Sequence, residues 1–300
     1  MKELIIGSHV SFRKQEQLLG STLEAISYDA NTFMLYTGAP QNAARSPIDI
    51  EITSLAHKLM KEKNIDSKNV IVHAPYIINL ASNTDFATDF LKQEIERVET
   101  LGLTKLVLHP GSHVKLGTET GLRNIIIALN KAIPTNSNVV ICLETMAGKG
   151  TECGRNFEEI KTIIDGIHYK ENIGVCLDTC HINDAGYDLN NFDEVLNQFD
   201  KIIGLNYLKC IHINDSKNII GSKKDRHENF GFGTIGFDNL INIIYNKKLE
   251  YIPMILETPY IGQTADSKER LYPPYKFEIQ MIRNKKSNPN LLDDIRNYYK

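Results

Sequence analysis

Short apolar runs alternate with amphipathic segments along the whole chain. The run Gly174–Leu177 is apolar throughout and stops abruptly at polar residues. Such short continuous runs are typical of parallel strands that are buried on both faces. Seven further segments have the same character. The eight predicted strands are Leu4–Gly7, Thr32–Tyr36, Val70–Ala74, Lys105–His109, Val139–Glu144, Ile173–Asp178, Leu208–Asn214 and Pro253–Glu257.

An amphipathic segment follows each predicted strand. In residues 84–101 apolar side chains recur at helical spacing, with Thr84 as the predicted N-cap and Gly102 as the predicted C-cap. Three further helices are expected to open at Ser46-Pro47, Asn156 and Asn191. The remaining predicted helices cover Gln15–Tyr28, Glu119–Ala132, Phe237–Lys248 and Tyr275–Asn284.

Eight consecutive strand–helix units predict an α/β fold, a closed (β/α)₈ TIM barrel. An open doubly wound sheet is the competing fold, but Gly7-Ser8-His9 does not supply a glycine-rich nucleotide loop after the first strand. We therefore expect a single barrel domain over residues 1–284. The charged residues 285–300 are expected to form a C-terminal tail or a short helix.

Composition is that of an ordinary globular protein, with 42% hydrophobic and 24% charged residues. No apolar run approaches the roughly 20 residues that span a bilayer, so no membrane association is expected. The cysteines are odd in number, and Cys142, Cys176 and Cys210 fall in predicted strands, which suits reduced thiols in a cytoplasmic protein. A net charge of −3 gives no overall attraction to nucleic acid, so DNA binding would need a local patch or bound cations.

Imidazoles and carboxylates follow six successive predicted strands. Asp178 is the last residue of one strand, and His181 is expected on the loop three residues later. Because parallel strands end at one edge of the sheet, these side chains should meet at the mouth of the barrel. The predicted ligands are His73, His109, Glu144, Asp178, His181, His212, Asp225, His227 and Glu257.

A satisfied core histidine or an ion pair would explain any one of these residues, but not the whole set. Mixed nitrogen and oxygen donors suit zinc, with manganese or iron as alternatives. Nine ligands are too many for one ion, so two or three ions are expected. Glu144 would bridge two of them about 3.5–4 Å apart, the spacing of two-metal phosphoryl chemistry. A zinc–thiolate site at Cys176 and Cys180 is the weaker interpretation because their spacing is not C-x-x-C.

Taken together, these motifs resemble the endonuclease IV family of abasic-site endonucleases. The resemblance extends from HVS at 9–11 to the last predicted strand and leaves out the residues after about Arg283. The motifs that carry it are HAPYIINLA at 73–81, HPGSH at 109–113, LETMAGKG at 143–150, GVCLDTCHINDAGYD at 174–188, HINDSK at 212–217, DRHENFGFGTIG at 225–236 and ILETP at 255–259.

The resemblance implies a DNA-repair hydrolase with three Zn²⁺ ions, for which Mn²⁺ would substitute. His73, His109 and Glu144 resemble the ligands of the first zinc ion. By the same resemblance, Glu144 is shared with the second ion. The second ion would be held by Glu144, Asp178, His212 and Glu257, and the third by His181, Asp225 and His227.

The implied partner is double-stranded DNA that contains abasic sites, bound by a monomer. Tyr76 and Ile77 resemble residues that wedge into the duplex, and Gln41 and Asn42 occupy the tip of a segment, YTGAPQN at 36–42, that resembles a DNA-contacting loop. Arg226 is a further expected phosphate contact.

The expected reaction cuts the phosphodiester on the 5′ side of the abasic site and leaves a 3′-hydroxyl and a 5′-deoxyribose phosphate. The hypothesis for catalysis is attack by a hydroxide held between metal ions, with Glu144 bridging the ions and Glu257 orienting the nucleophile.

Two other functions fit parts of the pattern. A metal-dependent sugar isomerase would use the same barrel and carboxylate-bridged ions, but it does not need the third set of ligands. A non-catalytic protein that binds damaged DNA would keep zinc for structure, yet structural zinc sites are usually closed and rich in thiolates.

Overall fold

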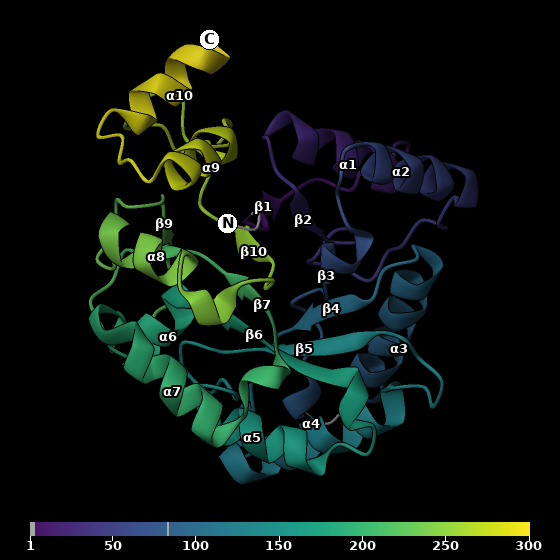
Figure 1. Cartoon of the computed structure of the whole chain (residues 1–300). Helices are drawn as coiled ribbons and strands as arrows, with labels where there is room; N and C mark the ends of the chain where they lie inside the picture. Colours follow the sequence, from purple (N-terminus) through teal and green to yellow (C-terminus); the bar gives the residue numbers. More distant parts are fainter. Residues whose placement is uncertain (1–3, 83) are drawn as a thin grey trace.

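Eight parallel strands close into a barrel in the computed structural model, which describes residues 4–82 and 84–300 (Figure 1). These strands are β1 (Ile6–His9), β2 (Thr32–Leu35), β3 (Ile71–His73), β4 (Lys105–Leu108), β5 (Val140–Glu144), β6 (Ile173–Asp178), β7 (Leu208–His212) and β10 (Met254–Leu256). Each strand pairs with its neighbours in the chain, and β1 closes the ring by pairing with β10. The predicted TIM barrel is confirmed.

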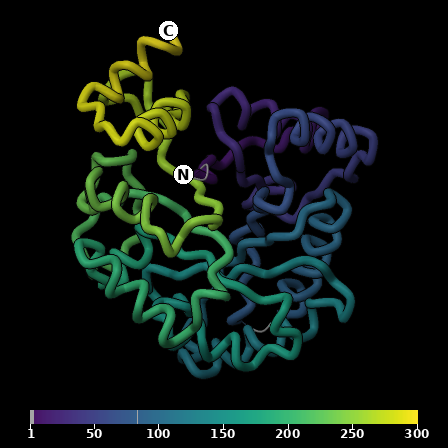
Figure 2. The backbone as a smooth tube through the Cα atoms, in the orientation of Figure 1, coloured from purple at the N-terminus to yellow at the C-terminus, as the bar shows by residue number. Residues whose placement is uncertain are grey.

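Helices surround the strands, and the tube in Figure 2 follows the alternation of strand and helix around the ring. The helices are α1 (Gln17–Ser27), α2 (Ile50–Glu62), α3 (Asp85–Thr100), α4 (Thr118–Ala132), α5 (Phe157–Gly166), α6 (Thr179–Ala185), α7 (Phe192–Ile202), α8 (Phe237–Ile244), α9 (Tyr275–Asn284) and α10 (Leu291–Tyr299). No helix in the described part of the chain is long and apolar enough to cross a membrane.

A separate layer of side chains fills the interior of the barrel. Cys142, Cys176 and Cys210 belong to this layer and are fully buried. Each lies two residues before the last residue of its strand, so it shares a strand face with Glu144, Asp178 or His212. The layer therefore forms an apolar floor beneath the residues at the strand ends. Its members are Met34, Ile71, Val107, Cys142, Cys176, Cys210 and Ile255.

Local hydrogen bonds explain where several helices begin. The predicted caps of two helices are confirmed, because Thr84 accepts the amide of Ala87 and Asn156 accepts the amide of Glu159. The predicted start at Ser46-Pro47 is wrong. The helix begins at Ile50 instead, because the Asp49 carboxylate accepts the first free amides of α2 and caps it there.

The structure differs from the prediction after β6, and at the C-terminus it shows the short helix that was one of the two expected forms. His181 lies in α6 rather than on a loop, because this helix starts directly at the end of β6 with Asp178 as its cap. Residues 291–299 form α10, and Leu291 and Ile295 are fully buried in the main hydrophobic cluster. The division of the chain at residue 285 stays a prediction.

Candidate metal centre

The predicted ligands stand at the carboxyl ends of the strands. His73, Glu144, Asp178 and His212 are the last residues of β3, β5, β6 and β7. The register places Asp178 directly beside His212 across the β6–β7 pair. His109 and Glu257 each follow a strand end by one residue. Parallel pairing thus brings all six side chains to one edge of the barrel, as the sequence predicts.

The first group of donors consists of His73, His109 and Glu144. Their ligand atoms lie within 4.8 Å of one another. The Nε2 atoms of both histidines are 3.1 Å from Oε2 of Glu144. His73 Nδ1 donates its proton to the carbonyl oxygen of Ala74 at 2.7 Å, which fixes the tautomer and turns the Nε2 lone pair towards the centre.

The second group shares Glu144 with the first. Nδ1 of His212 lies 3.1 Å from Oε1 of Glu144 and 3.0 Å from Oε2 of Glu257, and Asp178 completes the group. Glu144 therefore presents Oε2 to one set of imidazoles and Oε1 to another. This is the arrangement that a carboxylate bridging two cations requires.

The third group gathers around Asp225. Its Oδ1 lies 3.0 Å from Nε2 of His181 and 3.5 Å from Nε2 of His227. His181 donates Nδ1–H to the carbonyl oxygen of Thr145 at 2.8 Å, so its Nε2 is again the free donor. The thiol of Cys180 lies within 4.8 Å of the donors of Asp225 and His227, a neighbour that was not predicted. Burial raises the pKa of Cys180 and so disfavours a thiolate there.

Opposite charges compensate one another in the centre. Burial opposes ionisation of Glu144, but the imidazoles of His212 and His109 hold the pKa of its carboxyl well below the ordinary value. Burial likewise opposes protonation of His212, yet Glu257 and Glu144 raise its pKa well above the ordinary value. The carboxylates thus demand positive charge, which protons on the imidazoles or cations between the groups can supply.

The donor set fits divalent cations. His73, His181 and His227 each direct Nδ1 at a backbone carbonyl, which leaves Nε2 free, and the buried Nε2 of His227 has no hydrogen-bond partner. Imidazole nitrogen combined with carboxylate oxygen suits zinc or manganese better than calcium or magnesium. The assignment of each residue to a particular ion stays a prediction.

Asn214 was missed as a functional residue by sequence reasoning. Its Nδ2 donates to Oδ2 of Asp178 at 2.7 Å and to Oε2 of Glu257 at 3.4 Å, while its Oδ1 accepts the amide of Glu257. It thereby sets the separation of two predicted ligands. The sequence signal is the amide residue type two positions beyond a strand-end histidine, and the structure adds that this amide is fully buried and hydrogen-bonded.

The strands β8 (Asp215–Ser216) and β9 (His227–Glu228) form a hairpin that carries Asp225 and His227 of the third group. Asp184 holds this hairpin in place. The fully buried Asp184 carboxylate accepts the Ser216 hydroxyl at 2.7 Å and the amide of Asp225 at 3.0 Å. This fixes Asp225 relative to α6, which carries His181. The sequence motif contains Asp184 but gives no sign of this connection.

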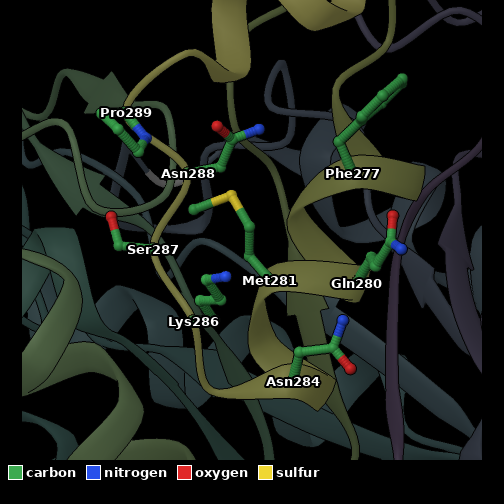
Figure 3. A pocket seen from close by; sticks show the side chains of 8 residues that line it. All are labelled: Phe277, Gln280, Met281, Asn284, Lys286, Ser287, Asn288 and Pro289. Atoms are coloured by element: carbon green, nitrogen blue, oxygen red, sulfur yellow. The ribbon is translucent and has the colours of Figure 1, made fainter.

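The predicted DNA contacts lie on loops at the same end of the barrel. Tyr76 is 54% exposed and follows β3 with the half-buried Ile77, whereas Gln41 and Asn42 are exposed beyond β2. Arg226 is exposed between β8 and β9. Their roles in DNA binding stay predictions. The hollow in Figure 3, between α9 and residues 286–289, contains none of the predicted ligands or DNA contacts.

Known proteins are similar to this chain in fold and in sequence. Residues 23–283 match the family described as xylose isomerase-like TIM barrel. A probable endonuclease 4 of Bacillus licheniformis is 53% identical over 299 residues, covering 98% of this chain and 99% of the relative. The crystal structure of endonuclease IV from Thermus thermophilus aligns with a TM-score of 0.76 and 26% identity, over 93% of this chain and 97% of that one.

A D-tagatose 3-epimerase-like protein also aligns, with a TM-score of 0.65 and 19% identity, over 98% of this chain and all of that one. That similarity shows the fold alone. The fold and the strand-end donors define an enzyme of the TIM-barrel class with a candidate metal centre. Within that class the chain belongs to the endonuclease IV family, so the expected family and the expected hydrolase class are confirmed.

Proposed function

We propose that the protein is a zinc-dependent endonuclease that hydrolyses duplex DNA on the 5′ side of an abasic site, leaving a 3′-hydroxyl and a 5′-deoxyribose phosphate. Near-complete alignment with a probable endonuclease 4 at 53% identity supports the activity. The observation that carries the proposal is the position of Glu144, whose two carboxylate oxygens face two different sets of imidazoles.

The ligands would be divided among three ions as the resemblance implies. His73 and His109 would hold one ion with Glu144, and Asp178, His212 and Glu257 would hold a second with the same carboxylate. His181, Asp225 and His227 would hold a third. Zinc bound by these groups would supply positive charge to the phosphate oxygens and lower the pKa of a water molecule to about 7.

Glu257 is suited to orient the attacking water. Its carboxylate is 18% exposed, whereas those of Glu144 and Asp178 are almost fully buried, so it reaches further towards the open mouth. The side-chain oxygen of Asn214 accepts the backbone N–H of Glu257 and so fixes the Glu257 backbone. This limits the directions in which the Glu257 carboxylate can point. Attack of the water oxygen on phosphorus would break the bond to the 3′-oxygen, and the proton that the water gives up would convert that oxygen to the 3′-hydroxyl.

Binding of a polyanion by a chain with a net charge of −3 requires local positive charge. The bound cations would supply part of it. Exposed basic residues on the loops around the strand ends would supply the rest. These residues are Lys115, Lys149, Lys217 and Arg226.

Selection of an abasic nucleotide would rely on the weak interactions that keep it inside the duplex. A nucleotide without a base has lost pairing and stacking, so extruding it costs less than extruding an intact one. Tyr76, three residues after the predicted ligand His73, is 54% exposed, and Ile77 next to it is half-buried. An aromatic and an aliphatic side chain placed in this way can wedge into the duplex and fill the vacated space.

The decisive test replaces Glu144 with Gln. E144Q should lower the rate of nicking of an abasic duplex by at least about a hundredfold and reduce the zinc content, because one amide oxygen cannot bridge two ions. The matched control is E171Q, which changes an exposed carboxylate at the opposite end of β6. Near-normal nicking by E144Q would contradict the proposal.

A further inference from the structure

The segment 36–49 connects β2 to α2 and contains neither helix nor strand. It begins beside the metal centre, where the ring of Tyr36 lies 5.0 Å from the ring of His73. Its tip, residues 41–44, is exposed. Among the described residues, the backbone–backbone hydrogen bond within the segment is the long one from Asn42 to Ala39, at 3.4 Å. Side chains must therefore hold the tip in its conformation.

The side chain of Arg45 binds several backbone carbonyls of the tip. Nη1 of Arg45 donates to the carbonyl oxygens of Ala39, Asn42 and Ala44 at 3.4, 3.1 and 2.8 Å. Gly38 permits this close approach, because a Cβ at that position would lie 2.8 Å from the same nitrogen. The guanidinium thus replaces the hydrogen bonds that a regular turn would make.

Glu94 on α3 fixes Arg45 in turn. Its Oε1 lies 2.5 Å from Nε of Arg45, and the two side chains are only 0% and 7% exposed. The other carboxylate oxygen accepts the hydroxyl of Thr37 at 2.7 Å, at the start of the same segment. The Arg45 guanidinium also lies 4.9 Å from the ring centroid of Phe90, one turn earlier on α3. Glu94 therefore connects both the beginning and the tip of the segment to one rigid helix.

Arg97 on the same helix secures the remainder. Its guanidinium donates to the carbonyl oxygens of Ser46 and Thr37, at 2.8 and 2.9 Å. None of these groups belongs to the predicted metal ligands. A buried guanidinium, a buried carboxylate and the half-buried Arg97 thus all hold the shape of one irregular segment. Burying charged groups is costly, which indicates that this shape matters.

We propose that Glu94 is a positioning residue for DNA recognition, which acts through Arg45 to hold residues 36–49 in the conformation that binds the duplex. The inference rests on the proposed function, in which Gln41 and Asn42 at the exposed tip contact DNA. Ordering the segment before binding removes an entropic penalty that would otherwise weaken the complex. Glu94 therefore governs affinity for duplex DNA and leaves the chemistry at the metal centre unchanged.

The experiment compares E94Q with the wild-type holoenzyme on two substrates. An abasic duplex reaches the tip, whereas bis(p-nitrophenyl) phosphate is a small diester that reaches the metal centre alone. E94Q should raise KM for the duplex by about tenfold or more, with kcat within about threefold. Its activity on the small diester and its zinc content should match the wild type. E96Q, an exposed position on the same helix, is the matched control.

A second variant guards against misfolding. R45Q/E94Q removes both charges, so no lone charge stays buried, and it should show the same rise in KM. In a Q41A/N42A background E94Q should add little, since residues that act through one another are not additive.

Each other result has a distinct meaning. An unchanged KM, an equal loss on both substrates, or failure of both variants to fold would overturn the positioning role. A wild-type protein that does not cut abasic DNA would overturn the proposed function itself.

Discussion

Two clusters of buried charge in this molecule differ in how they are balanced. Glu94 is paired with the Arg45 guanidinium, and both Arg45 and Arg97 donate to backbone carbonyls, so the chain itself supplies the positive charge that balances this carboxylate. At the strand ends four carboxylates face five imidazoles, and three of these imidazoles already direct Nδ1 at backbone carbonyls. That cluster needs positive charge from outside. The imbalance, more than the burial, marks the metal centre.

Removing the cations should have the largest effect. Treatment with 1,10-phenanthroline should abolish nicking of an abasic duplex, because the centre would lose the charge that offsets the phosphate. Added zinc should restore it. The measurement is nicking rate against zinc content determined by emission spectroscopy, with a non-chelating phenanthroline isomer as the control. Cleavage that continues in magnesium after the zinc has gone would contradict the zinc assignment.

The balanced cluster should instead respond through stability. E94Q leaves the Arg45 guanidinium without its partner and should lower the free energy of unfolding by about 3 kcal/mol. R45Q/E94Q should cost less, because neither charge remains. Urea denaturation of both variants and of E96Q measures this difference. If R45Q/E94Q is less stable than E94Q, the loss of stability in E94Q does not come from leaving the Arg45 charge unpaired.

Asp184 tests the connection between the hairpin and the third group. D184N keeps the size of the side chain but removes the charge that accepts the Ser216 hydroxyl and the Asp225 amide. Zinc affinity of the weakest-held ion should fall by about 10–100-fold. Competition with a chromogenic chelator measures it, and D165N, an exposed position at the end of α5, serves as control. Unaltered affinity would mean that Asp225 is held by other contacts.

Glu278 is a buried carboxyl with hydrogen-bond donors but no cation. It accepts from the Thr258 hydroxyl and the Phe230 amide, and burial raises its pKa to about 7. The folded protein therefore binds a proton that the unfolded chain releases near pH 4.5. This contribution to stability is complete below that pH and is lost as pH rises towards 7.

E278Q should remove this pH dependence. The wild type should lose about 2–3 kcal/mol of unfolding free energy relative to E278Q between pH 5 and pH 8. Urea denaturation at several pH values measures it, with E269Q as the exposed control. A difference that stays constant with pH would show that Glu278 does not titrate in this range.

Prediction from sequence succeeded where one local signal sufficed. Each strand is a short apolar run, and each run ends in a residue of distinct chemistry such as Glu144 or Asp178, so both the barrel and the convergence of the donors followed. It failed where distant residues decide the local structure. Pro47 looked like a helix start, but Asp49 caps α2 and the preceding residues are held by α3.

The hydrogen bonds that Asn214 and Asp184 make could not be predicted from the sequence either. Each joins residues more than 30 positions apart in the chain. A single sequence records the type of such a residue but not its partners.

The apolar floor, which includes Met34, Cys142 and Cys176, determines how ions and DNA can reach the donors. Each side chain of this layer is fully buried, so in the described part of the chain the barrel is sealed below the donors. Ions and nucleic acid must then reach the donors from the same open end of the barrel, so a bound duplex would cover the route by which an ion leaves.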